Sequence, residues 1–589
     1  MSALVLAGLL ALAGDSLEVA PPCPGGAVVT RTDLEAAGAG HLREALRLAG
    51  RDAVSVHGLD ALPTATAGVP FTSAVRVLVD GAPALRGGGI EPLGVEALLI
   101  VLGEVERVVL CPGDGVAGGA FGGPWIDVQT AAPARQAYAA AVLGNESGDP
   151  GPLRYLRDQP NVDRWGPDLE AAAVAHAGDA TAWLSLRDQL FRPTDPAVFP
   201  RTVTATVPTF FPKRTGRTFT LAGQRRGLRA RASVRRFDDL PFVAGAGREI
   251  PLTHHSAQST VSGSATHGGV RVWGHGHLSH VRIDRPPWSA LEADPSWSDV
   301  RADAALALEV ARGGQSAAGG GRLEVVGARA PGLDATVAVG RAWLRAASSR
   351  PQSGVAMTLS GTGAGGGIGA GGQAEAWWRG PVGVRATLSA RRTLPEERLD
   401  GAVWAGRGYR APGIAGLEAV QAPEDVARAQ IVLDGTAARL GWTVGADAQR
   451  GRALEAEGSA LRAWASARWG ARVLEVAAGG RVQRAMSGTA AYRAAWDRVP
   501  GARAWLQATV RPDDRLALWG RLEGVDGTEW RPGRTPAFLT LDLGVSKRAW
   551  RDHLRLSLGG RNVLGADERT HPLGARLEPR LFIRAQADL

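Results

Sequence analysis

The sequence predicts an all-β transmembrane barrel of about 22 antiparallel strands, preceded by a small α+β domain. After residue 130, short runs alternate apolar and polar residues and are separated by turns rich in Gly, Pro, Asp and Arg. This is the pattern of strands with one face toward lipid and the other toward a polar lumen. At about 20 residues for each strand and its turn, this part of the chain is long enough for about 22 strands.

The last hundred residues show the alternation most clearly. Four runs each place apolar residues on one face: Leu516, Leu518 and Leu522; Leu539, Leu541, Leu543 and Val545; Leu554, Leu556 and Leu558; and Leu581, Ile583, Ala585, Ala587 and Leu589. A soluble β-sandwich would show the same alternation. The number of consecutive hairpins favours the barrel, in which the apolar face meets lipid. Mean hydropathy is -0.06, which argues against a helical membrane protein.

The domain at residues 27–130 combines short strands with one helix. Residues 75–79 alternate like a strand, and Asp80-Gly81 then turns the chain. A second strand follows Glu106-Arg107 and runs into a glycine-rich stretch that ends at the strand-like residues 125–128. Earlier, residues 28–49 read as a strand, a turn and a helix, because Thr32 and Glu35 have the spacing of a capping box.

This layout resembles the plug domain of TonB-dependent outer-membrane receptors, in which a VLVDG strand, an IER strand and a glycine-rich strand follow in the same order. The matching positions are Asp80, Gly81, Glu106, Arg107, Gly122 and Gly123. The resemblance implies that residues 27–130 form a plug inside the lumen of a barrel at 131–589. One motif departs from the family: Cys111-Pro112-Gly113 stands where Arg-Gly-Pro is usual, which puts an arginine-mediated latch between plug and barrel in doubt.

Two segments later in the chain extend the resemblance. Residues 406–412, followed by Pro423-Glu424, look like a barrel motif of the same family, and residues 562–580 are similar to its closing hairpin. The matches therefore cover both ends of the chain and its middle.

The N-terminus predicts export. Residues 3–13 form an apolar stretch that ends in a small-x-small pattern, so we interpret residues 1–13 as a signal peptide, atypical because no positively charged region precedes it. Residues 14–26 follow as a linker. Within it, one segment is similar to the family's TonB box: Asp15, Ser16, Leu17, Glu18, Val19 and Ala20. The resemblance implies that this segment adds as a strand to the inner-membrane TonB complex. The alternative is a plain linker.

The net charge of +9 comes almost entirely from arginine, since Lys213 and Lys547 are the only lysines. No basic cluster dominates, so no nucleic-acid partner is expected. Two interpretations stay open. The arginines can belong to a polar lumen and a rim that faces lipid and lipopolysaccharide, or to a lumen that selects an anionic ligand. Cys23 and Cys111 are too few for a disulfide-built fold and are either bridged or buried as thiols.

Six of the 11 histidines fall within residues 254–280. This is the one local enrichment of a residue type that could bind a ligand. His275 and His277 share a strand face with Arg271, and two imidazoles at this spacing can bind a transition metal or a haem-like ligand. These three residues are our candidate ligand contacts, and ordinary polar lumen side chains are the alternative. No catalytic constellation or cofactor motif is present, so neither an enzymatic activity nor a resident cofactor is expected.

The resemblance implies a receptor in the cell outer membrane that imports a scarce ligand, such as an iron chelate or cobalamin, with energy from the TonB complex. The ligand itself is not indicated, because several ligand classes use this scaffold in the family. The alternative is a receptor-derived barrel that no longer transports and serves as a surface-binding or structural protein.

Overall fold

The structure is a computed structural model of the 589-residue chain. It describes residues 27–31, 55–59, 62–66, 76–83, 100–111, 125–133, 137–145 and most of 165–588. Gaps in this last range fall at 192–213, 244–248, 285–296, 331–332, 365–366, 395–423, 454–455, 498–499, 531–532, 551–552 and 567–579. The TonB-box segment, Cys23 and most of the predicted helix at 28–49 lie outside the described residues.

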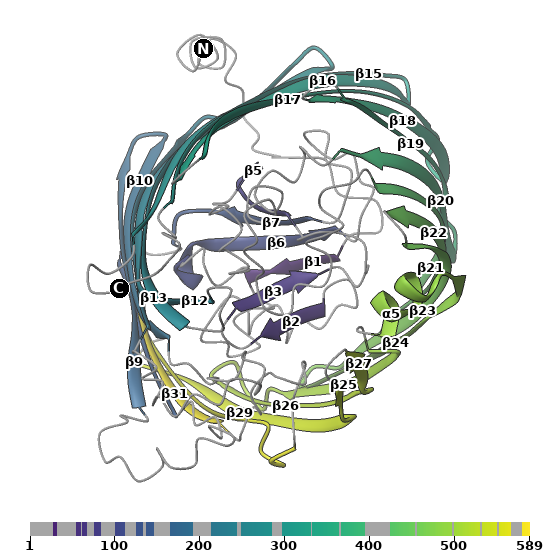
Figure 1. The fold of residues 1–589 in the computed structure, drawn as a ribbon. Helices are drawn as coiled ribbons and strands as arrows, with labels where there is room; N and C mark the ends of the chain where they lie inside the picture. The colour runs from purple at the N-terminus through teal and green to yellow at the C-terminus, as the bar shows by residue number, and fades with distance from the viewer. Residues whose placement is uncertain are drawn as a thin grey trace.

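A closed barrel of 22 antiparallel strands forms the body of the molecule, so the predicted fold class is confirmed (Figure 1). The first half consists of β8 (Ala137–Asn145), β9 (Trp165–Ala177), β10 (Ala180–Phe191), β11 (Arg214–Arg225), β12 (Leu228–Val243), β13 (Glu249–His267), β14 (Val270–Asp284), β15 (Trp297–Arg312), β16 (Gln315–Ala330), β17 (Leu333–Ser349) and β18 (Ser353–Ala364). The second half consists of β19 (Gly367–Trp378), β20 (Val382–Thr393), β21 (Glu424–Ala437), β22 (Leu440–Ala453), β23 (Ala456–Gly470), β24 (Leu474–Gly488), β25 (Ala502–Val510), β26 (Leu516–Val525), β29 (Phe538–Ala549), β30 (Leu554–Arg561) and β31 (Arg580–Asp588). β31 pairs with β8 and closes the cylinder.

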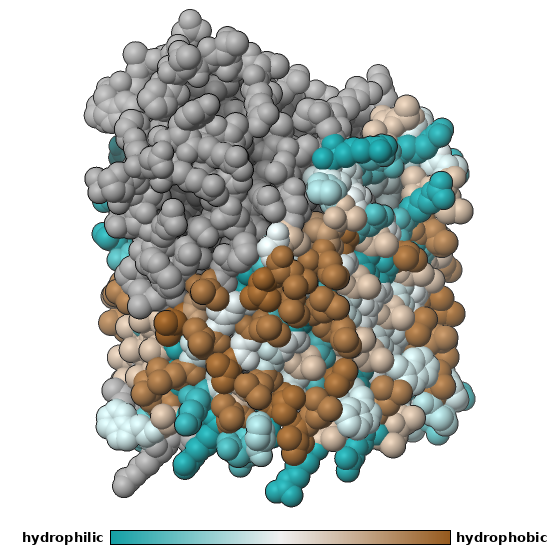
Figure 2. All heavy atoms as spheres, turned by 90° about the horizontal axis from the view of Figure 1, so that it is seen from below, coloured by the Kyte–Doolittle hydropathy of each residue, from teal (hydrophilic) through white to brown (hydrophobic). Residues whose placement is uncertain are grey.

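The alternation read from the sequence separates the two faces of the wall. On β29, Leu539 and Leu543 are 48% and 46% exposed and point outward, whereas Thr540 and Asp542 between them are buried toward the lumen. Figure 2 shows apolar side chains gathered in a band across the visible wall, with hydrophilic side chains along its lower margin. An apolar outer band and a polar interior are the signature of a barrel that spans a membrane of the outer-membrane type.

The lumen side of the wall is rich in buried arginine. These residues are Arg187, Arg229, Arg231, Arg235, Arg301, Arg322, Arg341, Arg428, Arg462, Arg481, Arg521, Arg561 and Arg584. Some contact carboxylates on neighbouring strands; Asp447, for example, accepts hydrogen bonds from Arg428 and Arg462. Long side chains of this kind fill the space that a wide barrel leaves open.

Strands are joined at one end of the barrel by turns of two to five residues, several of which use paired left-handed residues. Gly268 and Gly269 have φ of 57° and 81°, and Gly313 and Gly314 have φ of 58° and 80°. Two residues with positive φ make the type I′ turn, whose twist matches that of the flanking strands. In outer-membrane barrels the short turns face the periplasm and the longer loops face outward. The turn end is therefore the periplasmic end.

A five-stranded sheet lies inside the barrel (Figure 1). Its strands follow the order β1 (Ala27–Thr30), β6 (Val105–Cys111), β7 (Trp125–Thr130), β4 (Arg76–Val79) and β5 (Ala82–Pro83). The predicted turn at Asp80-Gly81 is confirmed, because the two residues have φ of 52° and 79° and register Val79 with Ala82. We call this sheet and its connections the plug.

The remaining elements are small. β2 (Ser55–Leu59) pairs with β3 (Leu62–Thr66), and β27 (Thr528–Trp530) pairs with β28 (Gly533–Thr535). The helix α5 (Ala490–Asp497) packs Tyr492 and Trp496 against Ala460 of the wall. Among the described residues, none of the helices is long and apolar enough to cross a membrane.

Candidate functional site

The plug carries two buried carboxylates on the side that faces β12. Asp80 sits in the tight turn that follows β4, and its side chain is 3% exposed. Glu104 ends the short 3₁₀ helix η2 (Leu102–Glu104) immediately before β6, and its side chain is fully buried. Buried carboxylates are costly unless charged or hydrogen-bonding groups surround them, so their partners define what this contact does.

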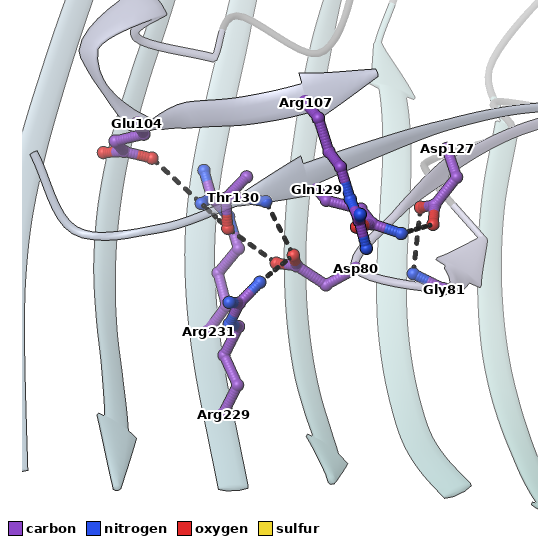
Figure 3. Close-up of polar contacts among 9 residues, drawn as sticks. All are labelled: Asp80, Gly81, Glu104, Arg107, Asp127, Gln129, Thr130, Arg229 and Arg231. Carbon is purple, nitrogen blue, oxygen red and sulfur yellow. Dashed lines mark hydrogen bonds and ion pairs between the residues drawn. The ribbon is translucent and has the colours of Figure 1, made fainter. Parts of the chain in front are cut away.

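Asp80 ties the turn to the neighbouring plug strand and to the barrel (Figure 3). Its carboxylate accepts hydrogen bonds from the backbone N–H of Thr130, at 2.8 Å, and from the Thr130 hydroxyl, at 2.7 Å. The guanidinium of Arg229 on β12 donates a third bond to the same carboxylate, at 2.5 Å. The turn that the sequence predicts therefore positions a charged contact between plug and barrel.

Glu104 makes the second ion pair, with Arg231, over 2.9 Å (Figure 3). Arg231 also donates to the hydroxyls of Thr130 on the plug and Thr220 on β11, each at 3.4 Å. Arg229 and Arg231 stand two residues apart on one strand, so both side chains point into the lumen.

A third contact lies at β9 and β10. Arg187 donates a hydrogen bond to the backbone carbonyl of Ile100 at 2.6 Å and pairs with Glu170 at 3.2 Å. Glu170 in turn accepts from the backbone N–H of Leu102 at 3.3 Å. Next to these groups, Val101 packs against Ala140 of β8 and Ala172 of β9.

We call Asp80, Glu104, Glu170, Arg187, Arg229 and Arg231 the latch. All six side chains are buried, with exposures of 6% or less. In such a site the attraction between charges roughly offsets the cost of taking them out of water, whereas removing one partner alone costs about 3–5 kcal/mol. The latch therefore holds the plug in one register, and breaking a single pair destabilises it strongly.

The latch reverses the polarity expected from the family motif. The sequence put a plug arginine at Cys111-Pro112-Gly113 in doubt. In the two ion pairs that join plug and barrel, the barrel supplies the arginines and the plug supplies the carboxylates. Cys111 ends β6, and the two residues after it lie outside the described residues. Arginines at positions 229, 231 and 235 share one face of β12. Our sequence analysis did not use this pattern, which could have indicated a charged face toward the lumen.

Other motif residues support the latch from within the plug. Asp127 accepts hydrogen bonds from the Gly81 backbone N–H at 3.0 Å and from the Gln129 amide at 3.1 Å. Burial raises the pKa of Asp127, against the opposing effect of these hydrogen bonds. Arg107 donates to Gln129 at 2.5 Å, whereas Glu106 is exposed. Gly122 and Gly123 lie outside the described residues.

The candidate ligand contacts Arg271, His275 and His277 all point into the lumen from β14. His275 and His277 are 5% and 7% exposed, and each has a partner on the wall: Asp303 lies 2.5 Å from His275, and the Thr260 hydroxyl lies 2.9 Å from His277. Strand register places His275 level with Ser262 and hence with Arg229 of the latch, in the periplasmic half of the wall. A role in ligand binding stays a prediction.

Arg271 differs from the two histidines in its partner. Its guanidinium lies 5.5 Å from the centre of the Trp273 ring, within cation–π range. Among the described residues, no group of three or more His, Cys, Asp or Glu is placed to hold a metal ion.

Fold and latch define a class of protein: an outer-membrane barrel of 22 strands whose lumen holds a separate N-terminal plug. Solved structures share this architecture. A variant of the ferric enterobactin receptor PfeA from Pseudomonas aeruginosa superposes with a TM-score of 0.70 at 9% identity, covering 96% of this chain and 98% of that chain.

Two further receptors give similar values. The siderophore receptor PirA from Acinetobacter baumannii has a TM-score of 0.68 at 7% identity, covering 96% of this chain and 98% of that chain. The ferric yersiniabactin uptake receptor FyuA from Yersinia pestis has a TM-score of 0.65 at 11% identity, covering 96% and 97%. No protein-family model and no curated protein sequence matches the chain. The resemblance to TonB-dependent receptors read from the motifs is thus confirmed at the level of the fold.

Proposed function

We propose that this protein is a TonB-dependent outer-membrane receptor that imports a scarce ligand, such as an iron chelate or cobalamin, into the periplasm. The observation that carries the proposal is the latch: a separate domain sits in the lumen and is fixed to the wall by two buried ion pairs and by hydrogen bonds to Arg187 and Glu170. This arrangement suits a barrel lumen that the plug closes at rest and that opens when the plug moves.

Ligand binding at the extracellular side would favour a state in which the TonB box is exposed to the periplasm. The TonB complex would then pair with residues 15–20 by strand addition and pull. A pull on the plug must break these ion pairs. Breaking each pair costs much free energy, because it leaves a buried charge without its partner. The proposal needs no catalytic step.

The test is uptake by cells that carry Leu17→Pro. Proline removes a backbone N–H donor and fixes φ, so an added strand loses its pairing at that position. Uptake of the cognate ligand, found by comparing a deletion strain with its parent across candidate ligands, should collapse, while binding at the cell surface remains. Gly25→Pro, in the same linker but outside the box, is the matched control and should transport normally.

Unchanged uptake by the Leu17→Pro variant would place the box elsewhere. A deletion strain that takes up every candidate ligand as its parent does would support the non-transporting alternative instead.

A further inference from the structure

Five consecutive turns at the periplasmic end of the barrel each carry one exposed arginine. The turns connect β15 to β16, β17 to β18, β19 to β20, β21 to β22 and β23 to β24, which form the upper and right-hand part of the ring in Figure 1. The arginines are Arg312, which ends β15, and Arg350, Arg379, Arg439 and Arg472 in the four following turns. We call these five residues the arginine arc.

The guanidinium groups of the arginine arc have no ion-pair partner among the residues that the structure describes. Four acidic residues lie within five positions of the arc along the chain: Glu309, Glu375, Asp434 and Glu475. Glu375 pairs instead with Arg385 at 3.2 Å. Glu475 pairs with Arg468 at 2.6 Å and with Arg511 at 3.5 Å. The five turns themselves contain no acidic residue, so the arc keeps its positive charge.

The other side of the periplasmic end differs, because two of its turns contain carboxylates. Asp179, in the turn between β9 and β10, pairs with Arg225 at 2.9 Å and also with Arg226. In the turn between β25 and β26, the Asp513 carboxylate accepts hydrogen bonds from two backbone N–H groups of the same turn. Arg548 lies beside this turn, to which its backbone N–H donates a hydrogen bond. Positive and negative groups are therefore mixed on that side, whereas the arc is positive alone.

Backbone hydrogen bonds between neighbouring hairpins hold the arc in place. The N–H of Ser349 donates to the carbonyl of Gly314 at 2.6 Å, and the N–H of Arg379 donates to the carbonyl of Gln352 at 2.5 Å. A hairpin is about 10 Å wide, so neighbouring arginines of the arc stand about 10 Å apart. At this spacing a small anion can meet two of them at most. Binding all five requires an extended partner that carries several separate negative charges.

We propose that the arginine arc binds the peptidoglycan layer, the carboxylate-bearing polymer that lies in the periplasm next to the outer membrane. Its stem peptides carry free carboxylates, which arginine binds through paired, charge-assisted hydrogen bonds. The arc lies at the end of the barrel that faces this layer and has the complementary charge. After one carboxylate has bound, the next is held close to its arginine, so several weak contacts together attach the barrel. This attachment does not depend on import.

The experiment measures co-sedimentation of the purified full-length barrel, in a neutral detergent, with insoluble peptidoglycan sacculi. The reference is the same sacculi after their carboxylates have been converted to neutral amides. The test variant is Arg350→Gln with Arg379→Gln and Arg439→Gln. The matched control removes three arginines of the same end that have carboxylate partners: Arg225→Gln, Arg226→Gln and Arg511→Gln.

The test variant should bind sacculi about 10- to 100-fold more weakly, because each exposed arginine–carboxylate pair contributes about two- to fivefold. The control should stay within about threefold of the wild type. Amidated sacculi should bind the three proteins equally weakly, and about 0.5 M salt should remove the difference between them, since exposed pairs are screened. Heat-modifiable migration confirms that each barrel is folded. If the triple variant does not fold, Arg350→Gln with Arg439→Gln should lose about 4- to 25-fold.

Wild-type affinity of the folded test variant for sacculi would overturn the proposal. So would an equal loss in the control, which would show that total charge matters and not the arc. Equal binding of the wild type to amidated and untreated sacculi would show that carboxylates are not recognised. Vesicles of phosphatidylglycerol test the other source of negative charge at this level. A test variant that loses binding to these vesicles but not to sacculi would assign the arc to inner-leaflet lipid and would also refute the proposal.

Discussion

Replacing Glu104 with Gln should make the plug easier to unfold inside the barrel. The carboxylate is fully buried and lies 2.9 Å from Arg231, whose side chain is 5% exposed. The neutral amide leaves that guanidinium buried without its countercharge, a change that costs about 3–5 kcal/mol. A domain of this size unfolds in urea with a slope of about 1.2 kcal/mol per molar, so the midpoint for plug unfolding should fall by about 2–4 M.

The assay is the conductance of single barrels in a planar bilayer, with urea raised on the periplasmic side. Wild-type barrels stay closed until the plug unfolds, and the urea concentration at which half of them conduct reports the stability of the plug. Glu529→Gln is the control, because its pair with Arg534 is exposed at 57% and 77% and such pairs contribute about 0–1 kcal/mol. This control should keep the wild-type midpoint.

A double variant, Glu104→Gln with Arg231→Gln, separates the pair from its surroundings. It removes both charges together, so its midpoint should lie well above that of Glu104→Gln alone. The reasoning would be refuted by a midpoint for Glu104→Gln within about 0.5 M of the wild type. A double variant that loses the sum of both single effects would show that the two side chains do not act as a pair.

Three further outcomes are expected. Burial raises the pKa of Asp127 above 3.8, so Asp127 holds its proton more tightly in the folded plug than in the unfolded one. The free energy of plug unfolding should therefore fall as pH rises through the folded-state pKa. Asp127→Asn should flatten this dependence in urea titrations at several pH values. Gly544→Ala should lower the temperature at which the barrel loses heat-modifiable migration by several degrees, because the new Cβ would meet the Trp519 ring and overpacking costs about 1–3 kcal/mol. His275→Ala with His277→Ala should keep ligand affinity if the wall contacts describe their whole role.

Each of these outcomes has a control. An unchanged pH dependence in the Asp127 variant would assign it to another group. Gly340→Ala meets no atom within 4 Å and should leave barrel stability unchanged, so an equal loss there would point to strand propensity and not to the indole. A clear loss of ligand affinity in the folded histidine variant would identify a ligand contact, as the sequence pattern allows.

The sequence predicted most of the fold because its strongest signals are local. Alternation on β29 and β31 and the turn at Asp80-Gly81 depend only on neighbours in the chain, and the structure bears them out. The latch depends on Asp80 and Arg229, which are 149 positions apart, and nothing local links them. The alternating arginines of β12 were a local signal that our sequence analysis did not use, and the partners of those arginines are set by how the plug docks.

The histidine cluster shows the same limit in another form. The cluster of histidines was visible in the sequence, whereas their burial against Asp303 and Thr260 required the neighbouring strands.

The pairing of β31 with β8 constrains the order in which the protein is made. The barrel ends meet at a seam that registers Leu581 with Asn145 and Asp588 with Tyr138, and the last strand of the chain must be present to form it. The plug precedes β8 in the chain, so it is synthesised long before the seam can form. Val101 of the plug packs against Ala140 and Ala172 beside that seam. During biogenesis the plug therefore has to enter a curved sheet that is still open. The final pairing of β31 with β8 then encloses the plug.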